Sequence, residues 1–365
     1  MSSSTTERTA LASHFSAEPI LEPGLPIVDA HHHLWFVPAA TAAAMDALDS
    51  ITARALALTF RRVPRYLFDE LMADLRGGHN VRATVFNDAN AMYRASGPEE
   101  MRSVGEVEFV NGVAAMAASG VFGDVRACAG IVGGVDLCMG EKVEDVLAAH
   151  IRAGGNRYRG VRTGTLYDED PEILGPGVGP GTPHVLLNPN FRAGFSRLLK
   201  LGLSFDALLL EPQLPDLIDL ARAFPQTQII LNHVGAPIGV GRYAEKREER
   251  FPIWRGNMRT LATCANVAVK LGGLGIPFTG FESSVGATPA TSAQLAEEWH
   301  PYIETCIDAF GVDRCMFESN FPVDSASGSY AVVWNAFKRI TAGASSGEKE
   351  SLFGGTATRI YRLEI

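Results

Sequence analysis

Short apolar segments recur along the whole chain, and each is followed by a longer segment with apolar residues at three- and four-residue spacing. The short segments are rich in β-branched and apolar residues, which is typical of buried strands. There are eight of them, at residues 27–28, 82–86, 125–132, 158–162, 203–208, 228–231, 267–271 and 314–317. Segments such as 142–153, 215–224 and 294–310 have the spacing of helices that bury one face. Strand then helix, repeated eight times, predicts an α/β protein with a (β/α)8 TIM barrel.

A doubly wound open sheet is the alternative, but no glycine-rich phosphate loop follows the first strand to favour it. We therefore expect an N-terminal extension over residues 1–25 and a single barrel domain over 26–365. Long connections follow three strands, at about 36–79, 163–190 and 272–293. Loops at the carboxyl ends of barrel strands carry the chemistry, so these three are expected to cover a pocket. The Gly- and Pro-rich run Gly175–Gly181 within the second disfavours regular structure.

Composition narrows the function mainly by exclusion. The 365 residues carry a net charge of −9, which argues against nonspecific binding to the phosphate backbone of nucleic acid. Five cysteines, an odd number without a CxxC pair, predict reduced thiols in a cytoplasmic protein. The first 22 or so residues lack the apolar stretch of a signal peptide, and no later apolar run could span a membrane. A small molecule is the expected partner, and a homodimer is compatible with the long loops.

Three consecutive histidines end the first predicted strand, in the segment Asp29–Trp35. Because side chains alternate along a strand, Asp29, His31 and His33 are expected on one face and His32 on the other, packing face. Two converging imidazoles suit a metal ion, or a pair of donors and bases aimed at a substrate carbonyl. The apolar context argues against surface histidines or a tag, so this segment predicts a functional site.

Polar side chains also accumulate where the other predicted strands end. Taken one at a time, most of them could have a purely structural role. His233, for example, could be a buried histidine whose nitrogens are hydrogen-bonded, and Lys270 could form an ion pair. Their number at strand ends is what favours an active site at one face of the barrel. The set comprises Asp88, Arg159, Arg162, Glu211, His233, Lys270, Glu318, Asn320 and Asp324.

Four motifs together resemble the amidohydrolase superfamily, and more closely its lactonase branch, which includes fuconolactonase-like and 2-pyrone-4,6-dicarboxylate-lactonase-like enzymes. They are Asp29–Trp35, Arg159–Arg162, Asn232–Gly235 and Met316–Val323, and the likeness runs from about residue 26 to 362. The resemblance implies a TIM barrel that hydrolyses a carbonyl compound, most often a lactone of a sugar acid or of aromatic-acid degradation. By position, it matches His31 and His33 to the family's HxH pair and His233 to the histidine after strand six.

Two departures from the family pattern put the usual base in question. Asn320 stands where the superfamily has an aspartate, and Glu211 where it usually has a histidine after strand five. An amide cannot accept a proton at neutral pH, so a carboxylate must replace the missing base. Glu318, Asp324 and Glu211 are the candidates, although Glu318 could equally form an ion pair with Lys270. We favour Glu211, which precedes a proline at a strand end.

The leading hypothesis is hydrolysis of a small lactone. His31 and His33 would polarise the carbonyl, directly or through a metal, and His233 would orient or protonate the oxyanion or leaving oxygen. Glu211 would activate water, and Asn320 would position groups by hydrogen bonding. The tentative metal ligands are His31, His33 and Glu211, a two-histidine, one-carboxylate set for one Zn or Mn ion. The resemblance leaves metal-free catalysis equally open, since the lactonase branch includes such enzymes.

The substrate pocket is expected to combine charge, hydrogen bonding and aromatic surface. Arg162, with Arg159 or Arg94, would clamp a substrate carboxylate. The complete predicted set is Trp35, Tyr93, Arg94, Arg159, Arg162 and Asp324.

Two other functions remain open on the sequence. A metal-dependent non-oxidative decarboxylase or an amide hydrolase is possible because the same barrel hosts both reactions. A non-catalytic ligand-binding barrel that has lost its base is the other, and Asn320 is the residue that supports it.

Overall fold

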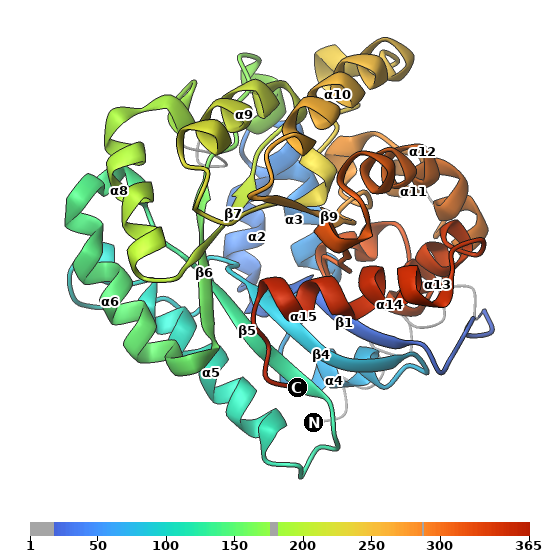
Figure 1. Ribbon diagram of the computed structural model, residues 1–365, viewed down its shortest axis with the longest axis horizontal. Helices are drawn as coiled ribbons and strands as arrows, with labels where there is room; N and C mark the ends of the chain where they lie inside the picture. The colour runs from blue at the N-terminus through green and yellow to red at the C-terminus, as the bar shows by residue number, and fades with distance from the viewer. Residues whose placement is uncertain (1–17, 176–181, 287) are drawn as a thin grey trace.

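An eight-stranded parallel barrel forms the centre of the protein (Figure 1). The computed structural model describes residues 18–175, 182–286 and 288–365. Neighbouring strands follow one another in chain order, which confirms the TIM barrel expected from the sequence. The strands are β1 (Pro26–His32), β4 (Asn80–Asn87), β5 (Arg126–Gly134), β6 (Tyr158–Gly164), β7 (Ser204–Leu208), β8 (Ile229–Leu231), β9 (Val267–Leu271) and β10 (Cys315–Phe317).

The barrel closes at the end of β1, beside the residues that follow β10. The backbone N–H of Asn320 donates to the carbonyl of His31 at 2.9 Å, and that of His33 donates to the carbonyl of Phe321 at 2.7 Å. The seam of the barrel therefore brings the histidine run against the Glu318–Asn320 segment.

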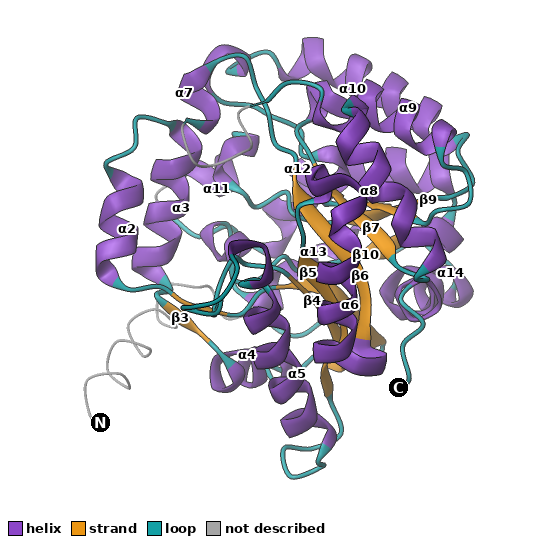
Figure 2. Cartoon of the chain, turned by 90° about the vertical axis from the view of Figure 1, so that its left-hand side faces the viewer, coloured by secondary structure: helices purple, strands orange, loops and turns teal. Residues whose placement is uncertain are grey.

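Helices surround the barrel and also extend over its carboxyl end (Figure 2). The outer ring consists of α5 (Val104–Ala118), α6 (Val143–Gly154), α8 (Pro189–Lys200), α9 (Leu214–Ala223), α10 (Arg247–Ala262), α12 (Ser292–Phe310) and α13 (Tyr330–Ile340). The long connection after β1 contains the two-stranded pair β2 (Trp35–Phe36) and β3 (Arg65–Tyr66), with α2 (Ala39–Asp46), α3 (Ile51–Arg62) and α4 (Phe68–Leu75). The chain ends with α14 (Ser346–Glu350), a π-turn at Ser351–Gly355 and α15 (Thr356–Ile360).

The other two long connections are also partly ordered. The one after β6 holds α7 (Pro171–Leu174) and a short 3-10 turn at Val185–Leu187, while residues 176–181 of its predicted irregular run lie outside the described residues. The one after β9 holds a 3-10 turn at Pro277–Thr279 and α11 (Glu282–Val285). Helix α3 contacts α7 and this Pro277–Thr279 turn, so the three connections meet over the carboxyl end of the barrel.

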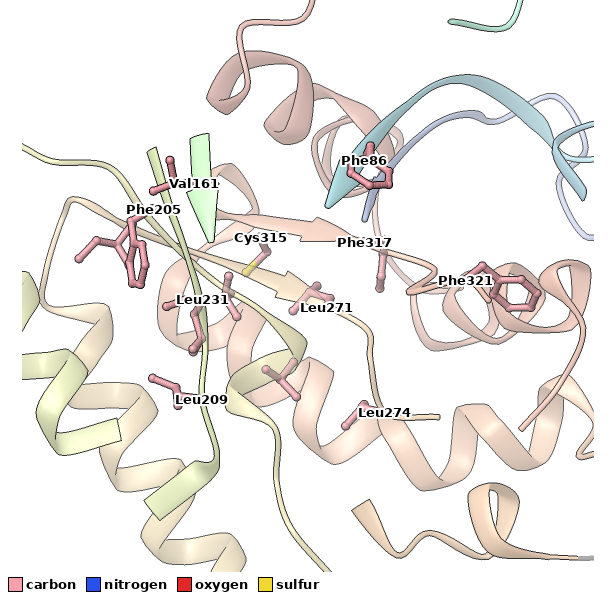
Figure 3. Close-up of a cluster of buried hydrophobic side chains, with 14 of the residues drawn as sticks. Phe86, Val161, Phe205, Leu209, Leu231, Leu271, Leu274, Cys315, Phe317 and Phe321 are labelled. Atoms are coloured by element: carbon pink, nitrogen blue, oxygen red, sulfur yellow. The ribbon is translucent and has the colours of Figure 1, made fainter. Parts of the chain in front are cut away.

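The apolar core has one layer outside the strands and one inside them. The outer layer packs strands against helices, and Figure 3 shows Phe205, Leu231, Leu271 and Phe317, which come from four different strands. Phe317 stacks on Phe337 of α13 with ring centroids 4.5 Å apart. The inner layer fills the amino-terminal end of the barrel with side chains such as Val28, Ala83, Ile230 and Met316, and Tyr361 from the end of the chain closes it. Because apolar side chains of the described residues fill this end, the polar side chains of the barrel interior lie toward the carboxyl ends of the strands.

The described part of the N-terminal extension packs on α12 and α13. The Glu18 carboxylate accepts from the backbone N–H of Ser292 at 2.7 Å, and Lys338 donates to the carbonyl of Leu21 at 2.7 Å. None of the helices formed by the described residues is long and apolar enough to cross a lipid bilayer.

Candidate active site

An irregularity in β1 decides which side chains reach the barrel interior. Along β4, Thr84 and Phe86 pair with Asp29 and His32, so β1 uses three steps where β4 uses two. Such a bulge reverses the alternation of side chains. Val28 and Ala30 face the interior before it, and His31 joins the interior network after it. The predicted shared face of Asp29, His31 and His33 is therefore wrong for Asp29, which accepts hydrogen bonds from Ser319 and from Tyr330 of α13.

His32 lies among packing residues rather than in the site. Its Nε2 is 2.8 Å from the hydroxyl of Thr84 and 3.7 Å from the sulfur of Cys128, and its ring meets the edge of Phe86. Burial lowers its pKa to about 4, so His32 is neutral at pH 7.

His33 has its tautomer fixed by the backbone of β4. Its Nδ1 lies 3.0 Å from the carbonyl oxygen of Asn87, which can only accept, so Nδ1 carries the proton. Its Nε2 then presents a lone pair, 3.2 Å from His31 Nε2 and 3.2 Å from Asn320 Oδ1. Trp35 stacks on this imidazole with ring centroids 6.1 Å apart. His33 is consequently an acceptor at the point where His31 and Asn320 converge.

Glu318 is the carboxylate that contacts the histidines. Its Oε1 accepts from His233 Nδ1 at 2.8 Å and from the backbone N–H of His233 at 3.0 Å, and its Oε2 lies 3.0 Å from His31 Nδ1. All three side chains are buried. A carboxylate on Nδ1 fixes the tautomer of an imidazole and raises the basicity of its other nitrogen. Glu318 thereby directs the Nε2 lone pair of His233 into the site.

His233 occupies strained backbone that other groups hold in place. His233 and Val234 have φ values of +56° and +47°, in the left-handed region that non-glycine residues rarely adopt. Trp254 of α10 donates its indole N–H to the carbonyl of Val234 at 2.9 Å. A Cβ on Gly273 would lie 2.1 Å from His233 Nδ1, and one on Gly272 would lie 2.5 Å from Glu318 Cγ. The Gly272–Gly273 pair is therefore required by the close approach of the site residues.

Lys270 connects the histidines to a buried polar cluster inside the barrel. Its Nζ is 2.7 Å from Asp206 Oδ1, 3.1 Å from Asn87 Oδ1 and 3.1 Å from His31 Nδ1. Tyr361 donates to the same Asp206 oxygen at 2.7 Å. Lys270 is thus a paired charge, but its partner is Asp206 of β7.

His31 Nδ1 has two neighbours of opposite kind, which allows two proton arrangements. If Nδ1 carries the proton, it donates toward Glu318, and His31 Nε2 presents a lone pair to His33. If Nδ1 accepts from Lys270, then Nε2 carries the proton and donates to His33. In the second arrangement Glu318 Oε2 receives no hydrogen bond, and its contact with His31 is close but poorly aligned.

Both interior imidazoles of the HxH pair are held neutral. Burial, and then the charge on Lys270, lowers the pKa of His31 well below its usual value. Burial, and then the charge on Arg162, does the same to the pKa of His33. Neutral imidazoles are the form that ligates metals or accepts protons.

Arg162 lies at the end of β6 and forms an ion pair with Asp88 after β4. Its Nε contacts the Asp88 carboxylate and its terminal nitrogen donates to the Asp88 carbonyl. Burial raises the pKa of Asp88, and Arg162 opposes that shift. A Cβ on Gly134 would lie 3.0 Å from Asp88 Oδ2 and 3.1 Å from the Tyr93 hydroxyl, so Tyr93 adjoins this pair.

Asn320 is held by Asp324. Its Nδ2 donates to Asp324 Oδ1 at 2.7 Å, and Asp324 Oδ2 accepts the backbone N–H of Gly275 at 3.0 Å. Burial raises the pKa of Asp324 well above its usual value. Within the described part of the chain, the hydrogen bonds of Asp324 lead to His33 through Asn320.

Glu211 is engaged elsewhere. Both of its oxygens accept hydrogen bonds from Arg250, at 2.6 and 2.7 Å, and its N–H donates to the carbonyl of Ala236. The expected ligand set of His31, His33 and Glu211 is therefore not the group that the structure assembles. Sequence spacing did not reveal Arg250, which lies on a helix 39 positions further along the chain.

Two predicted substrate-binding arginines also have other surroundings. Arg159 lies near the start of β6, at the opposite end of the barrel from the histidines, and donates to the carbonyl of Arg362 at 3.1 Å. Its predicted place in the substrate pocket is wrong. Arg94 forms a surface ion pair with Glu108.

Sequence reasoning missed three parts of the site. Asp206 and Asn87 are interior residues of β7 and β4, and Gly272–Gly273 is the start of the connection that the sequence predicts at about 272–293. The signal for the first two was a polar residue within a buried strand, which is costly unless it is paired. The signal for the glycines was two in succession directly after a strand.

The donor atoms around His33 suit a divalent cation. His31, His233 and Glu318 offer ligand atoms within 4.8 Å of one another, but a metal on His233 Nδ1 or Glu318 Oε1 would displace the 2.8 Å bond between these two atoms. His31 Nε2, His33 Nε2 and Asn320 Oδ1 need no such change, and tetrahedral zinc ligands lie about 3.4 Å apart. A cation on these three atoms would also keep the proton on His31 Nδ1, which lies 3.0 Å from Glu318 Oε2.

The chain thus combines a parallel barrel, an HxH pair at the end of its first strand and a histidine directly after β8. The chain belongs to the amidohydrolase family, because the model of that family, described as Amidohydrolase, matches residues 28–363. It is accordingly an amidohydrolase-superfamily hydrolase with a small-molecule substrate.

Relatives and solved structures are consistent with this placement. The uncharacterised protein y4mH of Sinorhizobium fredii is 33% identical over 340 residues, which cover 93% of this chain and 99% of that protein. An L-fucono-1,5-lactonase of Burkholderia ambifaria is 28% identical over 242 residues, 65% of this chain and 71% of that protein.

Among crystal structures, an amidohydrolase from Burkholderia multivorans with bound Zn is 24% identical, with a TM-score of 0.69 over 93% of this chain and 99% of that one. A putative 2-pyrone-4,6-dicarboxylic acid hydrolase from Pseudomonas putida is 16% identical, with a TM-score of 0.59 over 93% of this chain and 99% of that one. At these identities the two structures show the shared fold.

Proposed function

We propose that the protein hydrolyses a small lactone, such as that of a sugar acid or of an aromatic-degradation intermediate. The observation that carries the proposal is the Glu318 carboxylate shared by His31 and His233 beside His33. Glu318 orients His233 as a base next to the neutral imidazoles of His31 and His33, which can interact with a substrate carbonyl. The relatives named as L-fucono-1,5-lactonases support a lactone as substrate.

His233 is the group that moves the proton. With its Nδ1–H donated to Glu318, Nε2 accepts a proton from water as the water oxygen bonds to the lactone carbonyl carbon. The oxyanion then collapses, the ring C–O bond breaks, and the leaving oxygen takes the proton back from His233. Each reaction consumes one lactone and one water and yields one hydroxy acid. Glu318 stabilises the imidazolium that exists between the two transfers.

The HxH pair addresses the carbonyl oxygen. Because the proton of His33 is on Nδ1, where it is donated to the carbonyl of Asn87, its Nε2 cannot donate. Without a metal, the substrate carbonyl would therefore be polarised by an N–H on His31 Nε2. His31, His33 and Asn320 would hold a divalent metal, which when bound supplies Lewis-acid polarisation of the carbonyl. Asn320 is the weakest donor of the three, because it is an amide.

Arg162 is the proposed anchor for an acidic or hydroxylated substrate. Only part of its guanidinium is used by Asp88, and its side chain is 9% exposed, more than those of His31 and His233. Trp35 and Tyr93 supply aromatic surface near His33 and Asp88 respectively.

A panel of lactones tests the proposal. Purified protein should open at least one sugar-acid 1,5-lactone or carboxylated pyrone at a kcat/KM of roughly 10⁴ M⁻¹s⁻¹ or more, measured as acid release with a pH indicator. Aromatic carboxylic acids assayed for CO₂ release and simple amides serve as comparison substrates. Decarboxylation or amide cleavage without ring opening of any lactone would contradict the proposal.

A further inference from the structure

A basic hollow lies at the end of the barrel opposite the histidines. It has a volume of about 120 Å³ and is bounded by α5, by the starts of β5 and β6, and by the last residues of the chain. Its polar lining consists of Arg126, Arg157, Arg159, Asn156 and Glu364. This face carries none of the groups that the proposed hydrolysis uses.

The three arginines of this hollow lack anionic partners. Arg126 donates to the carbonyl of Asp124 at 3.2 Å, Arg157 to the amide oxygen of Asn111 at 2.7 Å, and Arg159 to the carbonyl of Arg362 at 3.1 Å. These acceptors are uncharged, and none of the three guanidinium groups forms an ion pair within residues 18–175, 182–286 and 288–365. Glu364, the single acidic group of the lining, is hydrogen-bonded to Asn156 at 3.3 Å.

Arg159 has, in addition, an unused donor. Its Nε is buried and has no hydrogen-bond partner among the described residues. A buried N–H without a partner is costly. Burial, and then the neighbouring Arg362, lowers the pKa of the Arg159 guanidinium, and Glu364 opposes that shift. The concentration of positive charge at this hollow is unexpected in a chain of net charge −9.

We propose that this hollow is a binding site for one small oxyanion of the carboxylate or phosphate type. Guanidinium groups match the oxygen geometry of such anions, and three of them border this one hollow. The volume of about 120 Å³ suits one small anion. Because the lining joins β5 and β6 to the end of the chain, a bound anion ties that end to the barrel.

A second hollow supplies a matched control. It is larger, about 310 Å³, and its lining includes Arg222, Thr263 and Asn266 but only this one arginine. Convergence of several cations, rather than a hollow with an arginine, is therefore what distinguishes the proposed site.

Thermal unfolding in the presence of inorganic phosphate or succinate, with ionic strength held constant by NaCl, tests the proposal. We expect at least one of the two anions to raise Tm saturably by about 2 °C or more, and the more effective one identifies the source of the anion. The R157M and R159M variants should lose this increase, and R222M should keep it. No increase beyond that with NaCl, or an increase that R157M and R159M retain, overturns the proposal.

Equilibrium dialysis keeps the proposal testable if those two variants fold poorly. Wild-type protein should bind one radiolabelled phosphate or succinate per chain. The R126M variant, which loses only the contact with the carbonyl of Asp124, should bind the same anion at least tenfold more weakly. Absence of binding to the wild type, or equal binding by R126M, overturns the proposal.

Discussion

Replacing Glu318 with glutamine is expected to lower kcat for lactone hydrolysis by about 10²- to 10⁴-fold. The amide keeps the size of the side chain but removes the negative charge that stabilises protonated His233. It also offers one acceptor oxygen where the carboxylate offers two, so it cannot serve both His31 and His233. Steady-state kinetics with the best lactone of the panel measures the effect.

Glu211→Gln is the matched control for this substitution. It makes the same chemical change at another buried carboxylate, whose partner is Arg250 rather than a histidine. We expect its kcat to stay within about tenfold of the wild type, with the main cost in stability, because a charged hydrogen-bonded pair is lost. Wild-type kinetics for Glu318→Gln would show that His233 does not depend on this carboxylate.

Gly273→Ala is expected to disable the site through sterics alone. The added methyl would lie 2.1 Å from His233 Nδ1, and the backbone at this position has φ of +65°. Strain of this kind costs about 1–3 kcal/mol before the imidazole is moved. Moving it breaks the 2.8 Å bond to Glu318, so kcat should fall at least about 100-fold. Chemical unfolding and steady-state kinetics report the two effects separately.

Gly256→Ala provides the comparison. Gly256 lies within α10, and a methyl there meets no atom within 4 Å beyond the backbone of its own helix. Alanine in a helix interior should stabilise the protein by about 0.5–1 kcal/mol and leave kcat unchanged. A Gly273→Ala variant as stable and active as Gly256→Ala would mean that His233 is not confined as described.

The sequence was sufficient to predict the barrel because each strand and helix carries its own periodic signal. The eight apolar segments correspond to β1 and β4–β10, and the amphipathic segments at 142–153, 215–224 and 294–310 correspond to α6, α9 and α12. Local propensity and burial agree at these positions, so no knowledge of distant contacts is needed.

The candidate site could be predicted only in part, because it depends on contacts between distant segments. The histidines were found from their own motif, but the choice between Glu211 and Glu318 depended on Arg250, which pairs with one of them. The direction in which Asp29 points depends on a bulge in β1, which arises from the pairing of β1 with β4. The alternation of side chains along a single strand cannot reveal such a bulge. Arg159 and Arg162 look equivalent in sequence but lie at opposite ends of β6.

The rate of lactone ring opening by His233→Ala, compared with wild type at equal enzyme concentration, tests the central claim most directly. That claim is that His233, oriented by Glu318, transfers the proton between water and the leaving oxygen. Acid release should fall by about 10²- to 10⁴-fold in the variant while circular dichroism shows the barrel intact. Ring opening by folded His233→Ala at the wild-type rate would contradict it.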